Sequence, residues 1–147
     1  MISSVARVRE QRGLSLLEVL VAIVILSLGL LGMAGLQAAS LRASQGSFYR
    51  AQAAQYADDI AERMRANLGQ ARTYGLALGD AAPTGTSVRD RDLADWLAKL
   101  RTLPGGAGSV AIDLGNNLVT ITVQWDDTRA GGPANAKYEV VTRIWNN

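Results

Sequence analysis

The sequence predicts an α+β protein, in which one long N-terminal helix carries a small antiparallel β-sheet. Three observations predict it. A run without charges extends from Glu18 to Arg42, a helical stripe with one polar face follows it as far as Leu68, and three strand-like runs lie beyond residue 108. We expect the apolar half of the helix to span a membrane and the amphipathic half to pack on the sheet. A short extra helix is expected in the connecting region.

The apolar run has the length of a membrane-spanning helix. From Val19 to Leu36 only one serine and three glycines interrupt the aliphatic side chains, and about 18 consecutive apolar residues are enough for a transmembrane candidate. A buried core helix is the alternative, but such a helix usually shows one polar face and this run shows none. We therefore expect 14–40 to be the transmembrane half of the long helix.

Basic residues flank this run unevenly. Three arginines precede it and two follow: Arg7, Arg9 and Arg12 before, Arg42 and Arg50 after. Because cytoplasmic flanks carry the excess of basic residues, this predicts a cytoplasmic N-terminus with the bulk of the chain across the membrane. The arginines at 1–13, with one glutamate, account for the formal net charge of +2, so the remainder is neutral. A nucleic-acid partner is therefore not expected, since it favours a basic stripe on the folded part.

The composition argues against an enzyme. The chain has neither cysteine nor histidine, which removes disulfides, thiolate metal sites and histidine-based catalysis. The acidic pairs at 58–59, 90–92 and 126–127 are poor catalytic dyads because adjacent side chains on a helix or strand point apart. Aspartates at 113, 126 and 127 lie close in sequence, but a calcium site needs further oxygen ligands that the sequence does not place. We expect no catalytic residue, metal or cofactor.

The amphipathic half of the helix is assigned to residues 41–68. Its apolar residues recur at helical spacing: Leu41, Phe48, Ala53, Tyr56, Ile60, Met64 and Leu68. Asp59 and Arg63 are spaced for an ion pair along the helix, and Gly69 is placed as a helix stop. The pattern thus predicts one helix from Leu14 to Leu68.

Residues 69–147 are expected to form the small globular domain. A short helix near 90–101, with Asp90 as its N-cap, would place one apolar face on the core: Leu93, Trp96, Leu97 and Leu100. Strands are predicted near 109–114, 118–125 and 138–145, with a hairpin turn at 115–117. Trp96, Trp125 and Trp145 lie on apolar faces and are expected in the core.

The stretch "GLSLLEVL", from Gly13 to Leu20, resembles the class III signal of type IV pilins and their relatives. The resemblance implies that 1–13 is a basic leader, which a prepilin peptidase removes by cutting between Gly13 and Leu14. The same enzyme would N-methylate Leu14, where this family usually has phenylalanine. Glu18 then takes the place of the family's signature glutamate. This part of the resemblance covers about the first 25 residues.

Two interpretations of Glu18 follow. Ser15 and Glu18 have the spacing of a capping box, and a carboxylate suits a helix N-terminus. After cleavage, however, Leu14 would carry a free amine in or near the apolar layer, where an unpaired charge is expensive. Pairing of Glu18 with a neighbour's amine would drive subunit docking and set the axial register. Pairing within one chain is also possible at this spacing, and the sequence does not separate the two.

Later segments are similar to the minor pilins of the PilV type: "SLGLLGMAGLQ", "ERMRAN", "WLAKLRTLPGG" and "VTITVQWDD". The resemblance implies a subunit that helps initiate a type IV pilus and is incorporated at its tip. Twitching motility and cell adhesion would follow. The alternative is a minor pseudopilin of a type II secretion system. Many pilins close a C-terminal loop with a disulfide, so here the candidate loop at 126–137 must be held otherwise or stay mobile.

The resemblance also implies partners and a location. The expected partners are other minor pilins, the major pilin, the prepilin peptidase, the inner-membrane assembly platform and a tip adhesin. The chain would first be a single-pass protein of the bacterial inner membrane, with its N-terminus in the cytoplasm. It would then become part of a pilus on the cell surface.

Overall fold

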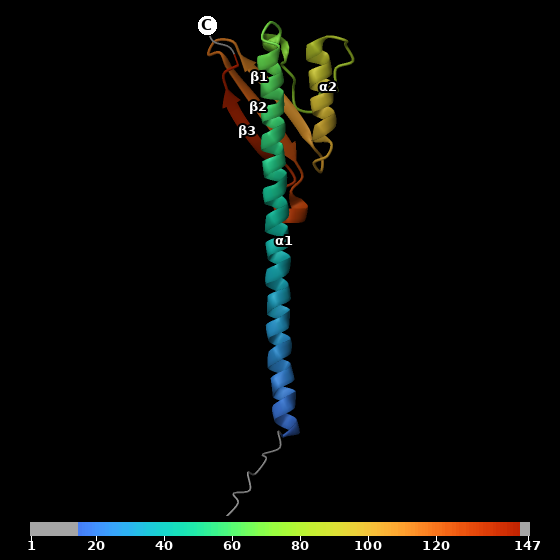
Figure 1. The fold of residues 1–147 in the computed structure, drawn as a ribbon, viewed down its shortest axis with the longest axis vertical. Helices are drawn as coiled ribbons and strands as arrows, with labels where there is room; N and C mark the ends of the chain where they lie inside the picture. Colours follow the sequence, from blue (N-terminus) through green and yellow to red (C-terminus); the bar gives the residue numbers. More distant parts are fainter. Residues whose placement is uncertain (1–14, 145–147) are drawn as a thin grey trace, which may run out of the picture. The chain divides into compact units, whose positions relative to one another are not determined.

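A computed structural model describes residues 15–144 (Figure 1). In chain order the elements are α1 (Leu16–Ala66), η1 (Ala71–Thr73), α2 (Val88–Leu100), β1 (Ala107–Asp113), β2 (Leu118–Trp125), η2 (Thr128–Ala130) and β3 (Ala136–Thr142). The long helix, the small antiparallel sheet and the short extra helix confirm the α+β fold class. The chain divides into two compact units, and the second begins at Ser40.

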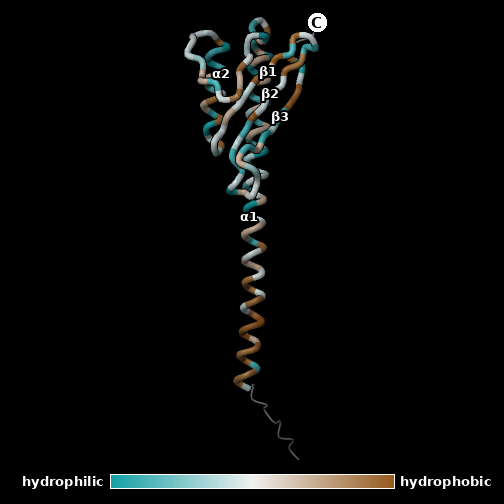
Figure 2. The backbone as a smooth tube through the Cα atoms, turned by 180° about the vertical axis from the view of Figure 1, so that it is seen from behind, coloured by the Kyte–Doolittle hydropathy of each residue, from teal (hydrophilic) through white to brown (hydrophobic). Residues whose placement is uncertain are grey.

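The first unit contains the N-terminal part of α1, and its apolar side chains are exposed. Figure 2 colours this stretch mostly as hydrophobic. Ser27, a polar residue within it, donates its hydroxyl hydrogen bond to the carbonyl of Ile23 at 2.7 Å. A hydroxyl bonded to its own backbone can be tolerated in an apolar environment. The helix therefore offers little that would oppose its transfer into lipid.

In the second unit the sheet has the order β1-β2-β3, and both pairings are antiparallel. Along β2 the residues Val119, Ile121, Val123 and Trp125 are buried, while the alternate positions are half-exposed. The bounds of β2 match the expected run. β1 and β3 each begin two residues earlier than expected, because they pair along the far end of β2: Ala107 lies opposite Gln124, and Ala136 opposite Trp125. Trp145 lies outside the described residues.

The hairpin turn at 115–117 is confirmed. Asp113 pairs with Leu118, and the turn between them places Asn117 at a positive φ of 54°. The Asp113 carboxylate accepts hydrogen bonds from the backbone N–H groups of Gly115 and Asn116, at 2.9 and 3.1 Å. Asp113 therefore serves the turn.

The face of α1 that packs on the sheet differs from the predicted stripe. Its buried residues are Ala53, Ala57, Ile60, Ala61 and Met64. Leu41, Phe48 and Leu68 were predicted to be in the stripe but are more than half exposed. The prediction favoured large side chains, whereas alanines on the contact face let a helix approach its neighbours closely. Tyr56 is half-buried at the edge of this face.

The helix α1 ends at Ala66, before the predicted end at Leu68, and Gly69 is not its stop. Asn67 donates its N–H to the carbonyls of Arg63 and Met64, and the chain then turns into η1. Gly69 is not among the residues with positive φ in the described chain. A single bridge between Leu76 and Val110 follows, in a segment that the sequence analysis did not assign to the sheet.

The helix α2 begins at Val88, and its N-cap is Ser87 in place of the predicted Asp90. The Ser87 hydroxyl oxygen accepts a hydrogen bond from the Asp90 N–H at 3.1 Å. The Ser87 hydroxyl in turn donates to the Asp90 carboxylate at 2.6 Å. Asp90 is thus the acidic third residue of the helix, where it faces the positive end of the dipole. Of the predicted face, Leu93, Trp96 and Leu100 are buried and Leu97 is half-buried.

The connection at 126–137 is held by its own backbone hydrogen bonds. Asp127 donates its N–H to the Pro133 carbonyl at 3.0 Å, and its own carbonyl accepts from Gly132 at 2.9 Å. Gly131 sits at a φ of 87°, which glycine adopts without strain. Gly46 of α1 lies so close that an added Cβ would be 3.3 Å from the Ala130 Cβ. The loop is thus held by contacts other than a disulfide, which is the first of the two alternatives that the sequence left open.

Candidate functional site: the N-terminal segment of α1

The start of α1 is capped by Ser15. Its side-chain oxygen accepts a hydrogen bond from the Glu18 N–H at 3.2 Å, and its carbonyl accepts from the Val19 N–H at 3.2 Å. The first contact satisfies an N–H group of the first turn that has no partner within the helix, and the second is the first regular hydrogen bond of α1. The structure therefore contains half of the expected capping box, the bond from the Glu18 backbone N–H to the Ser15 side chain.

The Glu18 side chain is exposed, and its carboxylate makes no hydrogen bond or ion pair with any other residue in 15–144. A carboxylate in the first turn is favoured by the helix dipole. At the start of an apolar helix it is also the group most in need of a cationic partner. Gly13 and Leu14, on which the expected cleavage and methylation fall, lie outside the described residues.

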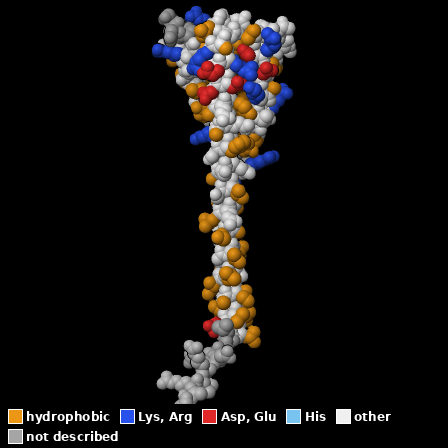
Figure 3. Space-filling model, in the orientation of Figure 1, with side chains coloured by type: hydrophobic (Ala, Val, Ile, Leu, Met, Phe, Trp, Pro, Cys, Tyr) orange, Lys and Arg blue, Asp and Glu red, His pale blue; other side chains and the backbone are white. Residues whose placement is uncertain are grey.

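The helix after Glu18 exposes a continuous apolar surface. Its most hydrophobic 18-residue window has a mean hydropathy of 2.7, and none of that window is buried. In Figure 3 hydrophobic side chains dominate this unit, whereas charged side chains gather on the second unit. Soluble monomers rarely expose apolar patches larger than a few hundred Å². The exposure argues against the core-helix alternative and is consistent with a surface that lipid or other protein chains cover.

A comparison with protein families finds the same segment. Residues 8–34 match the prokaryotic N-terminal methylation motif. This motif indicates a type IV pilin or pseudopilin. The match spans Gly13, Leu14 and Glu18 together with most of the apolar run, and it implies processing by a prepilin peptidase. The pilin-type motif does not extend into the second unit, and neither a curated protein nor a solved structure matches the chain.

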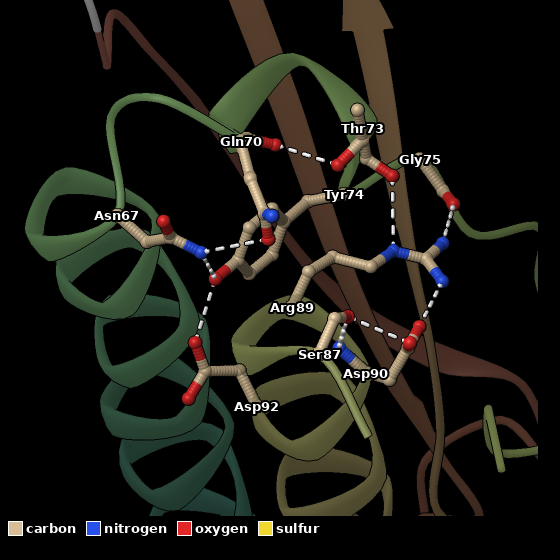
Figure 4. A network of polar contacts seen from close by, with 9 residues as sticks. All are labelled: Asn67, Gln70, Thr73, Tyr74, Gly75, Ser87, Arg89, Asp90 and Asp92. Atoms are coloured by element: carbon tan, nitrogen blue, oxygen red, sulfur yellow. Dashed lines mark hydrogen bonds and ion pairs between the residues drawn. The ribbon is translucent and has the colours of Figure 1, made fainter. Parts of the chain in front are cut away.

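In the second unit, the hydroxyl of Tyr74 joins the turn that follows α1 to α2 (Figure 4). It donates to the Asp92 carboxylate at 2.6 Å and accepts from the Asn67 side-chain amide at 3.0 Å. Burial of the ring, together with the bond to Asp92, raises the pKa of Tyr74 to about 12. Arg89 makes a second link, donating to the carbonyls of Thr73 and Gly75.

A cluster of ion pairs continues this link. Arg63 of α1 contacts Asp92 at 3.0 Å and Asp59 at 3.3 Å, and Lys99 of α2 reaches Asp59 at 2.8 Å. The predicted pair of Asp59 and Arg63 is therefore confirmed. From the sequence, the acidic pairs at 58–59 and 90–92 are considered as catalytic dyads, for which they are poor candidates. Asp59 and Asp92 instead hold the two helices together.

The aspartates considered for calcium do not gather. Asp113 pairs with the first residue of β2, whereas Asp126 follows its last residue, so the two lie at opposite ends of the strand. No group of three potential metal ligands of the His, Cys, Asp or Glu type occurs in the part of the chain that the structure describes.

Proposed function

We propose that the chain is a minor pilin of the PilV type, a structural subunit that helps initiate a type IV pilus and is incorporated at its tip. One observation carries the proposal: the methylation motif leads directly into an apolar helix with no buried face. A surface of this kind can be covered by lipid before assembly and by other pilins afterwards. No catalytic function is proposed.

In this proposal the chain has four functional parts. Residues 1–13 are the leader removed after Gly13, and Leu14 becomes the methylated N-terminus. Residues 14–40 anchor the chain in the inner membrane with the N-terminus in the cytoplasm. Residues 41–68 hold the globular domain, 69–147. Assembly would bring the chain into contact with the other minor pilins, the major pilin, the assembly platform and a tip adhesin.

Glu18 is the proposed docking residue. Its carboxylate is exposed and without a partner among the residues described. The methylated amine of a neighbouring Leu14 would neutralise it, which favours docking in an apolar layer because an unpaired charge there costs about 2.5–3.5 kcal/mol. Twitching motility and adhesion would depend on this step only indirectly, through pilus formation.

The first test is the intact mass and N-terminal sequence of the protein recovered from native membranes. A chain that starts at Leu14 and carries one added methyl group supports the pilin class. A chain that still starts at Met1 contradicts it and leaves Glu18 as a helix cap. Neither outcome depends on the structure of the second unit, because the test concerns the N-terminus alone.

The alternative, a minor pseudopilin of a type II secretion system, shares the signal and the apolar helix. Three segments of the second unit are similar to PilV-type pilins, which favours the pilus: "ERMRAN", "WLAKLRTLPGG" and "VTITVQWDD". They include the end of α1, the second half of α2 and most of β2, all of which contribute to the core. Recovery of the processed chain in sheared pili would support the pilus. Loss of protein secretion with normal piliation in a deletion strain would favour the pseudopilin.

A further inference from the structure

A cavity of about 560 Å³ lies in the second unit, beside residues 42–50 of α1. The connection between β2 and β3 and the start of β3 form its other walls. In Figure 1 the short helix η2 of this connection is drawn beside α1. No local sequence pattern predicts this cavity, because its walls come from segments some 80 residues apart in the chain.

The walls of this cavity carry unpaired positive charge. Arg42 and Arg50 both line it, and neither forms a hydrogen bond or ion pair with any residue that the structure describes. Lys137 of β3 also lines it, and among residues 15–144 its one ion pair is a long, exposed contact of 3.7 Å with Glu139. Three cations therefore face one space, which favours an anionic ligand.

Two buried polar atoms in the same walls also lack a partner. Trp125 is 2% exposed, and its Nε1 has no acceptor among residues 15–144. The Oδ1 atom of Asp127 is buried, and no donor within the described part of the chain reaches it. Unpartnered buried groups are rare in folded proteins. A ligand that combines an anionic oxygen with a hydroxyl group would offer both an acceptor and a donor to this wall.

The position of the cations along α1 identifies the source of such a ligand. Arg42 is the first charged residue after Glu18 and directly follows Leu41. If the apolar run spans a bilayer, the helical rise of about 1.5 Å per residue places Arg42 at the level of the headgroups. Arg50 lies about 12 Å further on, and its long side chain can extend back toward the interface.

We propose that this cavity binds the phosphate headgroup of an anionic lipid while the chain is anchored in the membrane. Arg42, Arg50 and Lys137 contact the phosphate, and Asp127 accepts a hydrogen bond from a headgroup hydroxyl. Phosphatidylglycerol has both features, whereas phosphatidylcholine carries a cation in place of the hydroxyls. The inference rests on the membrane-anchored stage of the proposed function. The lipid would leave the cavity when the subunit leaves the bilayer.

The experiment is native mass spectrometry of the full chain, released from vesicles that contain equal amounts of phosphatidylglycerol and phosphatidylcholine. We expect preferential retention of phosphatidylglycerol. Since one cation near an anionic surface contributes about 1 kcal/mol, each of Arg42→Gln, Arg50→Gln and Lys137→Gln should reduce this preference about fivefold. Arg91→Gln and Arg101→Gln, which remove charge outside the cavity, are the matched controls and should leave it unchanged.

A variant without a charge change separates the cavity from general attraction to the membrane. Ala43 lines the cavity on α1, and Ala43→Leu fills part of the space while keeping a good helix former. We expect it to reduce phosphatidylglycerol retention as the charge variants do. Unchanged retention in both Ala43→Leu and Lys137→Gln would mean that only unspecific juxtamembrane charge acts, which overturns the proposal.

Two further outcomes would reassign the site. Displacement of the retained lipid by millimolar inorganic phosphate would make the ligand free phosphate and overturn the lipid source. Normal lipid retention with lost pilus incorporation in Arg42→Gln would assign the cavity to an acidic side chain of another subunit. Equal retention of both lipids by a chain that is processed and assembled refutes this inference alone. Lipid selectivity in an unprocessed chain refutes the proposed function alone.

Discussion

Trp96 of α2 lies against Gly108 of β1 so closely that no Cβ fits between them. A Cβ built on Gly108 would be 2.4 Å from Cη2 of Trp96 and 2.5 Å from Cδ1 of Leu100. The indole is fully buried, and its Nε1 donates a hydrogen bond to the Tyr56 carbonyl at 2.8 Å. Trp96 therefore joins α1, α2 and the sheet at one point, and the glycine is what lets the indole lie over the strand.

The variant Gly108→Ala should destabilise the second unit. The extra methyl group must displace the indole or the strand, and overpacking of a core costs about 1–3 kcal/mol. The measurement is urea denaturation of the full chain in detergent, with tryptophan fluorescence as the signal of unfolding. Gly69→Ala is the control, since nothing lies within 4 Å of a Cβ there. Equal stability of both variants would show that the indole can move without cost.

This contact also shows where prediction from the sequence stops. The alternation of β2 and the face of α2 were predictable because they depend on local periodicity. The sequence pattern predicts a strand from Ser109, whereas β1 begins at Ala107 and includes Gly108, whose lack of a Cβ leaves room for the indole of α2. In the same way, the sequence does not predict the alanine face of α1, because alanines favour packing only where the neighbouring elements approach the helix closely.

The variant Tyr74→Phe should destabilise the second unit by about 1.5–3 kcal/mol, since it removes a hydrogen bond to a charged group. It should also change the response to alkali. The pKa of Tyr74 is raised from 10.0 to about 12 in the folded chain, so folding holds the phenolic proton more tightly than the unfolded chain does. This stabilisation is complete below pH 10 and is lost as the pH rises from 10 to about 12.

The measurement for Tyr74 is the free energy of unfolding between pH 8 and pH 12. The parent chain should lose stability over the upper part of this range, and Tyr74→Phe should lose less. Tyr138→Phe is the control, because Tyr138 is half-buried on β3 but is not part of the Asp92 network. Parallel pH curves for the parent and Tyr74→Phe would contradict the assignment.

Asp59 should contribute to stability above acid pH. Burial alone raises the pKa of its carboxyl, but the Lys99 hydrogen bond and the charges of Arg63 and Lys99 outweigh this, so the pKa lies below its ordinary value. A lowered pKa stabilises the folded chain above the unfolded pKa near 3.8, and the effect is lost as the pH falls through the folded value. Asp59→Asn should cost up to about 1 kcal/mol at pH 7, because the pair is partly exposed.

The test for Asp59 compares Asp59→Asn with Asp58→Asn, which changes the adjacent exposed carboxylate in the same way. Urea denaturation is measured at pH 7 and at pH 3. Only Asp59→Asn should differ from the parent at pH 7, and the difference should shrink at pH 3. A similar effect of both variants would indicate a change in total charge in place of a specific pair.

The candidate site at the start of α1 can be proposed from the sequence alone, whereas the polar links of the second unit cannot. The signal, the cap and the apolar run are contiguous, so each can be recognised from residues that are neighbours in the sequence. The link through Tyr74 and Asp92 joins distant segments, and so does the cavity that both Arg42 and Lys137 line. Single residues there look like ordinary surface charge until the fold brings them together.

The variant Gly13→Ala should block or slow removal of the leader. The proposed cut follows this residue, and a residue without a Cβ suits an extended, tightly bound peptidase site. The measurement is the ratio of unprocessed to processed chain in membranes, read by immunoblot and confirmed by intact mass. Gly29→Ala, which lies in α1 beyond the cut, is the control. Unchanged processing of Gly13→Ala would contradict the leader assignment.

The variant Glu18→Ala should leave processing intact but reduce pilus number or incorporation. Loss of the carboxylate leaves a neighbour's amine unpaired in the apolar layer at a cost of about 2.5 kcal/mol or more, which corresponds to about 60-fold fewer productive dockings. Ser15→Ala separates the two roles, since it removes the cap but keeps the carboxylate. If pili are counted by electron microscopy and both variants show the same defect, the capping interpretation is sufficient. A defect in Glu18→Ala alone assigns the carboxylate to docking, and normal piliation in Glu18→Ala rules that role out.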